Sequence, residues 1–213
     1  MKEKNVVIIG GNGHLGSAAV QGALQVEADV TILSRHAEPM NERTKAVTGS
    51  ITDKESLRSS LQDSDAVVVS VEADWTASGL NDIYVQGMRN VVQVAPDDSH
   101  IVFMGNIGVT DVERMPDYNR AKLEAESILR KSGKSYTIIR PSWIVSSHTG
   151  AKLEQGDQYT GRRDDVSHDQ LANAIAAILE NKVQSIGKTF ELYGSNEDIN
   201  DWSRALDALK VDQ

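Results

Sequence analysis

Residues 10–16, near the N-terminus, read GGNGHLG and contain both the GxGxxG and the GxxGxxG spacing. Glycines let a backbone turn tightly and approach a pyrophosphate, and a following helix offers free N–H groups and the positive end of its dipole. The pattern follows a β-branched apolar run and opens a predicted helix, Leu15 to Val26, which is the context that such a site requires. The alternative is an ordinary strand-to-helix turn. We expect the dinucleotide ligands Gly10, Asn12, Gly13, His14, Leu15 and Gly16.

The next predicted strand, residues 29–34, indicates which dinucleotide is bound. NAD sites usually place Asp or Glu about 20 residues beyond the glycines to hold the ribose hydroxyls. Here residues 33–36 read LSRH and contain no acidic side chain. Arg35 offers a cationic fork suited to a phosphate, and Ser34 adds a hydroxyl. We therefore expect NADP(H) in preference to NAD(H); a surface arginine at a strand end is the alternative.

A tyrosine and a lysine stand four positions apart in the stretch PDYNRAKLE, residues 116–124, which predicts a helix. Tyr118 and Lys122 therefore share one helix face. A free tyrosine has a pKa of about 10 and is a poor acid–base catalyst at neutral pH. A nearby ammonium group and the positive ring of an oxidised nicotinamide both favour the phenolate. The pair thus predicts proton transfer, although helix packing also produces this spacing by chance.

These motifs together resemble the short-chain dehydrogenase/reductase superfamily, and most closely its atypical, NAD(P)H-binding, NmrA-like branch. The similarity spans nearly the whole chain and is carried by residues 10–16, 33–35, 118–145 and 164–179. It implies that Tyr118 is the proton donor and that Lys122 both tunes this tyrosine and binds the nicotinamide ribose. It also implies cofactor contacts from Ser70, Val71, Glu72, Gly105, Pro141, Ser142 and Trp143.

One position departs from the family pattern. Active relatives usually carry Ser or Thr at the end of the fifth strand to hold the substrate carbonyl, whereas this chain has Gly105-Asn106 there. The Asn106 amide can donate a hydrogen bond to a substrate but cannot relay a proton. The expected function is an NADPH-dependent oxidoreductase acting on a small carbonyl or conjugated acceptor. The alternative is a non-catalytic, redox-sensing regulatory protein that binds NAD(P)H.

Strands and helices alternate over about 140 residues, which predicts parallel βαβ units. Strand patterns occur at residues 5–10, 29–34, 45–50, 65–71, 100–105 and 135–140, with helices at 15–26, 80–95 and 117–132 and one from a cap at Thr52 or Asp53 through Leu61. The tail predicts a glycine-rich stretch at 150–161, helices at 168–181 and 197–210, and a strand at 187–194. We expect one α/β domain, a Rossmann-type doubly wound parallel sheet, with a cofactor-binding core over about 1–145 and a small substrate cap over about 146–213.

Composition narrows the function classes. The chain has 213 residues and a formal net charge of −9, and an acidic protein repels phosphate backbones, so general nucleic-acid binding is not expected. It has no cysteine, which excludes thiolate chemistry and suits a cytoplasmic protein. The apolar run Val6 to Ile9 is too short for a signal peptide or membrane span, and the histidine spacing predicts no metal site.

A small-molecule substrate is the expected partner, and the oligomeric state stays open. Trp75, in a loop after the fourth predicted strand, is expected either to hold this substrate or to pack the loop. Tyr159, Arg162 and Arg163 are further candidates for substrate binding, with a solvated surface as the alternative.

Overall fold

The computed structural model describes residues 4–146, 150–156 and 164–213, so Tyr159, Arg162 and Arg163 lie outside the described residues. The described strands form one eight-stranded sheet and one two-stranded sheet. The larger sheet consists of β1 (Asn5–Ile9), β2 (Asp29–Ser34), β3 (Thr44–Thr48), β4 (Ala66–Val69), β5 (His100–Met104), β6 (Ser135–Pro141), β8 (Gly150–Glu154) and β10 (Lys188–Ser195). The smaller sheet pairs β7 (Ile144–Val145) with β9 (Val166–Ser167).

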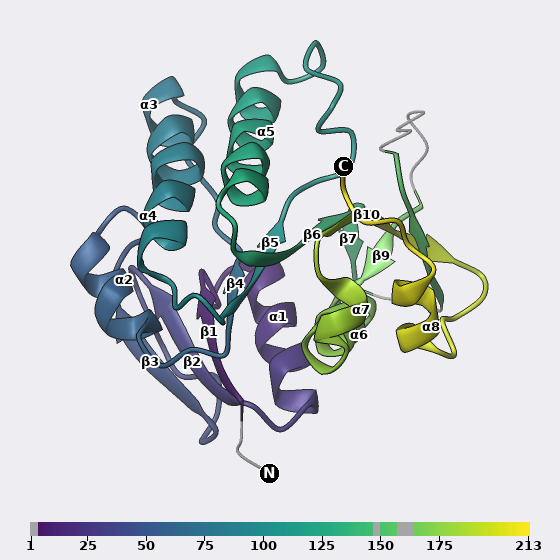
Figure 1. Cartoon of the computed structure of the whole chain (residues 1–213), viewed down its shortest axis with the longest axis horizontal. Helices are drawn as coiled ribbons and strands as arrows, with labels where there is room; N and C mark the ends of the chain where they lie inside the picture. Colours follow the sequence, from purple (N-terminus) through teal and green to yellow (C-terminus); the bar gives the residue numbers. More distant parts are fainter. Residues whose placement is uncertain (1–3, 147–149, 157–163) are drawn as a thin grey trace.

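The strand order of the large sheet is β3-β2-β1-β4-β5-β6-β10-β8, and every pair is parallel except β8 with β10. The order reverses direction between β1 and β4, which is where open α/β sheets bind ligands at the carboxyl ends of their strands. The predicted Rossmann-type fold is confirmed. The segments that follow β1, β2, β4, β5 and β6 therefore lie along one edge of the sheet (Figure 1).

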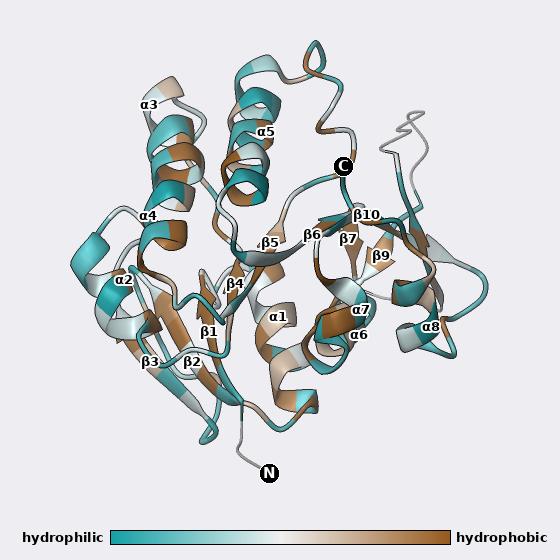
Figure 2. Ribbon diagram, in the orientation of Figure 1, coloured by the Kyte–Doolittle hydropathy of each residue, from teal (hydrophilic) through white to brown (hydrophobic). Residues whose placement is uncertain are grey.

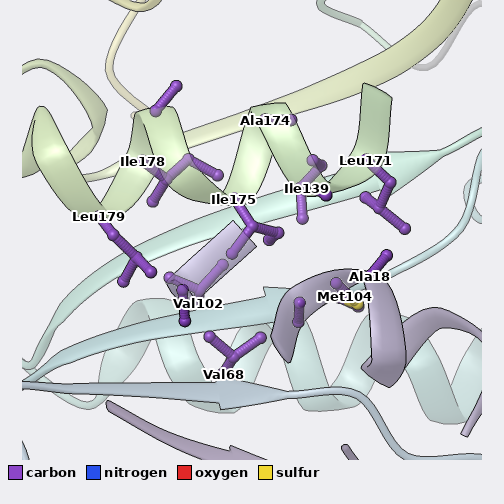
Figure 3. Close-up of a cluster of buried hydrophobic side chains, with 14 of the residues drawn as sticks. Ala18, Val68, Val102, Met104, Ile139, Leu171, Ala174, Ile175, Ile178 and Leu179 are labelled. Atoms are coloured by element: carbon purple, nitrogen blue, oxygen red, sulfur yellow. The ribbon is translucent and has the colours of Figure 1, made fainter. Parts of the chain in front are cut away.

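Helices cover both faces of the sheet, which explains why its strands are continuous apolar runs (Figure 2). On one face α1 (His14–Gln25) and α6 (His168–Glu180) pack against Val68, Val102 and Ile139, as Figure 3 shows. The other face is covered by α2 (Lys54–Leu61), α4 (Gly87–Val94) and α5 (Pro116–Lys131). Asp53 caps α2, as predicted, by accepting a hydrogen bond from the Glu55 N–H.

Several elements differ from the sequence prediction, which also did not include β7 and β9. The helix expected over 80–95 is divided into α3 (Ala77–Leu80), a π-helix η1 (Asn81–Gln86) and α4. The glycine-rich stretch contains strand β8, because pairing with β10 supplies its backbone hydrogen bonds. The last helix, α8 (Trp202–Asp207), is shorter than predicted, since its N-cap is Asp201 and not a residue near position 197. A short helix that was not predicted, α7 (Lys182–Ser185), precedes β10.

Candidate functional site

A cavity of about 760 Å³ lies at the carboxyl ends of the strands. Its walls include nearly all of the residues predicted to bind cofactor or substrate. These are Gly10, Asn12, Gly13, His14, Leu15, Ser34, Arg35, Ser70, Val71, Glu72, Gly105, Asn106, Tyr118, Lys122, Pro141, Ser142 and Trp143. The glycine-rich turn and the Tyr118/Lys122 pair, more than a hundred positions apart in sequence, thus face one continuous space.

The glycines of the turn have different tasks. Gly10 has φ +85°, and a Cβ there would lie 2.0 Å from the Ser70 carbonyl oxygen. A Cβ on Gly16 would lie 2.0 Å from the Gly10 carbonyl oxygen, so Gly16 lets α1 approach β1 closely and does not line the cavity. Gly13 is the N-cap of α1, with an ordinary φ of −76° and no side chain to cap the helix. The first N–H groups of α1 therefore have no side-chain cap and point toward the cavity, as backbone groups that can bind an anion do.

Asn12 ties this turn to the loop after β2. Its Oδ1 accepts hydrogen bonds from the Ser34 hydroxyl at 3.0 Å and the Glu38 N–H at 3.2 Å, and its Nδ2 donates to the Glu38 carbonyl at 2.9 Å. Arg35 is exposed at the cavity rim. Hydrogen bonds from Thr76 lower the pKa of the nearby Asp74 carboxyl. The Arg35 charge adds a smaller effect in the same direction. Asn12 thus positions the segment that carries Ser34 and Arg35.

Tyr118 lies between two aromatic rings. Trp75 stacks on it, with ring centroids 4.9 Å apart and planes inclined by 19°, and Tyr84 meets it edge-on at 5.6 Å. One turn further along α5, Lys122 is 3% exposed and its Nζ donates to the Met104 carbonyl at 3.2 Å. The same Nζ lies 4.3 Å from the centre of the Tyr84 ring. Trp75 lines the cavity and stays 66% exposed. Its ring therefore packs against Tyr118 and also faces the cavity.

Burial shifts both ionisable groups of the pair away from their charged forms. It lowers the pKa of Lys122 to about 8, with the Glu72 and Glu126 carboxylates opposing the change. Burial raises the pKa of Tyr118 to about 12. The Glu72 carboxylate raises this pKa further, whereas the Tyr84 hydroxyl lowers it. Desolvation is thus the largest influence on the Tyr118 pKa, and the tuning of Tyr118 by Lys122 stays a prediction. The phenol therefore keeps its proton at neutral pH.

Three residues that line the cavity have a buried polar atom without a hydrogen-bond partner: Asn106, Asn119 and Ser142. Asn106 donates through Nδ2 to the Ile107 carbonyl at 3.1 Å, which leaves its Oδ1 without a partner, and the Ser142 Oγ also has none. The Asn106 amide therefore offers an unpaired acceptor in addition to the second hydrogen of its Nδ2. Ser142 places a hydroxyl at the end of β6, the strand beside β5. Buried polar atoms are nearly always paired, so these three are available for a hydrogen bond with a ligand in the cavity.

Several cavity residues fall outside the predicted motifs. Gly49, Ser50 and Ile51 follow β3, and Arg114 and Asn119 come from the loop before α5 and its first turns. The first three follow from the rule that ligands bind beyond the carboxyl ends of parallel strands. The other two carry no spacing that sequence reasoning could use. The His14 ring lies 5.8 Å from that of His168 on α6.

Among the described residues, no group of three or more His, Asp or Glu side chains could hold a metal ion. In the same part of the chain no helix has the length and apolar character needed to cross a membrane.

A family model described as NAD(P)H-binding matches residues 10–182. Solved structures with the same fold include the oxidoreductase ylbE from Lactococcus lactis, with TM-score 0.79 and 19% identity over 96% of each chain. A Rossmann-fold NAD(P)-binding family protein from Shigella flexneri has TM-score 0.69 and 18% identity over 94% of this chain and 98% of its own. A short-chain dehydrogenase/reductase from Veillonella parvula, in complex with NADP, has TM-score 0.69 and 17% identity over 92% and 96%. A comparison with curated proteins finds no match.

Gly13→Val tests the phosphate site sterically. A Cβ at Gly13 meets only the Gly10 carbonyl oxygen, at 3.2 Å, and the backbone there suits any residue, so the fold should persist. The branched side chain would occupy the space in front of the α1 N-terminus, and dinucleotide binding should be lost. Calorimetric titration with NADPH and NADH measures this loss, and Ser59→Val on the exposed side of α2 is the control. Normal binding by folded Gly13→Val would place the phosphates elsewhere.

Lys122→Met tests the burial of the ammonium group through its pH dependence. Because the folded-state pKa, about 8, lies below the unfolded value of 10.5, the charged lysine destabilises the fold at neutral pH by on the order of 3 kcal/mol. This cost is complete below about pH 8 and disappears above the unfolded pKa. The stability of Lys122→Met relative to wild type should therefore be greater at pH 7 than at pH 10 in urea unfolding. Lys131→Met, at the exposed end of the same helix, should show no such difference.

Proposed function

We propose that this chain, which belongs to the NAD(P)H-binding family, is an NADPH-dependent oxidoreductase that reduces a small carbonyl or conjugated acceptor. The observation that carries the proposal is that Tyr118 and Lys122 line the same cavity as the glycine-rich turn. A dinucleotide whose phosphates lie at the α1 N-terminus can then extend along the sheet edge toward the Tyr118 hydroxyl. The fold shared with oxidoreductases such as the Lactococcus lactis protein is consistent with this reading.

The residues present fit a nicotinamide dinucleotide at both ends of the cavity. Gly13 leaves space at the helix N-terminus, and the unpartnered atoms of Asn106 and Ser142 offer polar contacts at the opposite end. Arg35 and Ser34, at the end of β2, are suited to the additional phosphate of NADPH. The shortage of acidic residues in this segment supports NADPH over NADH.

When bound, the reduced nicotinamide supplies a hydride. Tyr118 donates its phenolic proton to the acceptor oxygen as the carbonyl carbon is reduced, and the tyrosine is left as a phenolate. The raised pKa of Tyr118 keeps this proton in place at neutral pH, which suits reduction better than oxidation. Lys122 holds the nicotinamide ribose, and Asn106 orients the acceptor through the Nδ2 hydrogen that the Ile107 carbonyl does not take.

The composition of the β5 end supports a second function. Gly105 and Asn106 provide no hydroxyl where active relatives usually have one, so the chain is also a candidate for a regulatory protein that binds the dinucleotide without turnover. Such a protein would bind NADPH in the same cavity and would not oxidise it, whichever acceptor is supplied. The Tyr118 experiment below separates the two functions.

Arg35→Glu should weaken NADPH binding and leave NADH binding equal or stronger. A charge-assisted hydrogen bond to a phosphate contributes about 1.5–3 kcal/mol, which corresponds to roughly tenfold to a hundredfold in affinity. Calorimetry with both cofactors on both proteins measures the change. Arg43→Glu makes the same charge change at an exposed position that does not line the cavity and should leave both affinities unaltered. An unchanged NADPH affinity in Arg35→Glu would exclude the assigned role.

Tyr118→Phe removes only the hydroxyl and should lower turnover by about 10²–10⁴-fold, the usual contribution of a positioned acid, with little change in NADPH affinity. NADPH oxidation against aldehydes, ketones and quinones measures turnover. Tyr136→Phe, which removes a hydroxyl bonded to Asp212 away from the cavity, is the matched control. An active wild type whose rate survives Tyr118→Phe would refute the tyrosine mechanism. Absence of turnover with every acceptor, with binding intact, would favour the regulatory function.

A further inference from the structure

A second tyrosine lies directly behind Tyr118. Tyr84 belongs to the π-helix η1, which packs against α5, and it is only 1% exposed. Its ring meets the Tyr118 ring edge-on, and the Lys122 Nζ lies over its face. It is not among the residues that line the cavity. Tyr84 thus contacts both members of the proposed catalytic pair without reaching the space where substrate would bind.

The backbone determines the direction in which the Tyr84 hydroxyl can donate. The Ala73 N–H, in the loop after β4, donates to the Tyr84 oxygen at 3.3 Å. The hydroxyl proton is then available for the other neighbour, Tyr118, whose ring meets that of Tyr84 edge-on at 5.6 Å and whose pKa the Tyr84 hydroxyl lowers. Burial raises the pKa of Tyr84, with Tyr118 and Glu72 adding to the effect, so Tyr84 keeps its proton and acts as the donor.

We propose that Tyr84 is a positioning residue whose hydroxyl donates a hydrogen bond to the Tyr118 oxygen and stabilises the phenolate that forms when Tyr118 gives up its proton. The inference rests on the proposed function of Tyr118. Only the Tyr118 O–H bond breaks, and its proton moves to the acceptor oxygen; the Tyr84 O–H bond stays intact throughout. Tyr84 therefore supports the acid from behind, whereas Asn106 and the acceptor lie on the cavity side.

The charges around Tyr118 make such a donor necessary. The Glu72 carboxylate, in the loop after β4, disfavours a phenolate, and so does burial. The Lys122 Nζ lies 5.7 Å from the centre of the Tyr118 ring, on the same helix, and its own pKa of about 8 means that it loses charge as pH rises. Tyr84 is neutral, so its hydrogen bond persists where the ammonium does not.

The π-helix explains how Tyr84 reaches this place. Its wider turn inserts one additional residue relative to an α-helix, and this changes which side chains face α5. π-Helical turns often occur at functional sites. A regular α-helix through residues 81–86 would place side chains other than Tyr84 against Tyr118.

The test measures the pKa of residue 118 directly, without any substrate. A fluorinated tyrosine, whose phenol is more acidic than that of tyrosine, replaces Tyr118, and its ¹⁹F resonance is followed against pH. In the protein that carries the fluorinated tyrosine at position 118, Tyr84→Phe should raise the pKa of residue 118 by about one unit or more. This is the effect of losing one hydrogen bond to a charged group. Tyr136→Phe, the matched loss of a buried hydroxyl elsewhere, should leave it unchanged. An unaltered or lowered value in Tyr84→Phe would overturn the proposal.

A second variant covers a failure of Tyr84→Phe to fold. Fluorinated tyrosine at both positions 84 and 118 retains every ring and hydroxyl and makes residue 84 a stronger donor. The pKa of residue 118 should then be lower than in the protein that carries fluorine at 118 alone. An unchanged or higher value contradicts the proposed donor.

Kinetics separates this inference from the proposed function. With an acceptor that is turned over, Tyr84→Phe should lower kcat about tenfold with little change in KM, and should lower it no further in the Tyr118→Phe background. If Tyr118→Phe lowers turnover but Tyr84→Phe alters neither kcat nor the pKa, the proposed function stands and the role of Tyr84 is refuted. If Tyr118→Phe leaves turnover intact, the positioning role is refuted together with the proposed function, even where the hydrogen bond is found.

Discussion

Glu126 and Arg140 are buried side by side between α5 and β6. The Arg140 guanidinium donates to both Glu126 oxygens, from Nε at 2.9 Å and from a terminal nitrogen at 2.7 Å, and it also contacts Glu191 on β10 at 3.0 Å. A buried ionic network of this kind, in which Arg130 also contacts Glu126 at 2.9 Å, adds little net stability, but removing one member unbalances its charges, so the geometry is strongly enforced. Because Lys122 lies one turn from Glu126 and Ser142 follows Arg140 by two residues, the pair aligns both walls of the cavity. A Cβ on Gly105 would lie 3.0 Å from a Glu126 oxygen, so the end of β5 is fitted to it as well.

The cavity that results has two ends with different physical characters. At the α1 N-terminus and Arg35 it is open to solvent and positive, which suits the phosphates of a dinucleotide. At the α5 end, aromatic rings and burial remove solvent, and there the pKa values of Tyr118 and Lys122 move toward the neutral forms. Desolvation therefore determines the protonation state of the proposed acid more than its neighbouring charge does. The order of these two ends along the sheet edge is the order in which a dinucleotide would present its phosphates and its nicotinamide.

Local sequence patterns were sufficient for the fold and for much of the site. β-Branched runs such as Val67–Val69 form strands because both faces of a parallel sheet are covered, and the predicted βα alternation leads directly to the observed order. The glycine-rich turn and the segment after β2 could be found because glycine and charge requirements act over a few residues. Strand β8 was missed because its backbone groups are paired by β10, about 40 positions away, and no local preference records such a partner.

The sequence by itself determined that a dinucleotide-type turn and a Tyr/Lys pair exist in one Rossmann-type chain, since each depends on neighbours within a single turn or helix. Only the tertiary structure decided that Tyr84 lies against Tyr118, that Asn106 presents an acceptor and that Ser142, directly after β6, places an unpaired hydroxyl in the cavity lining. Only the tertiary structure, too, raised the pKa of Tyr118, because burial depends on how α5, η1 and the Trp75 loop pack together. Contacts between elements distant in sequence, and the solvent that they exclude, have no counterpart in residue spacing.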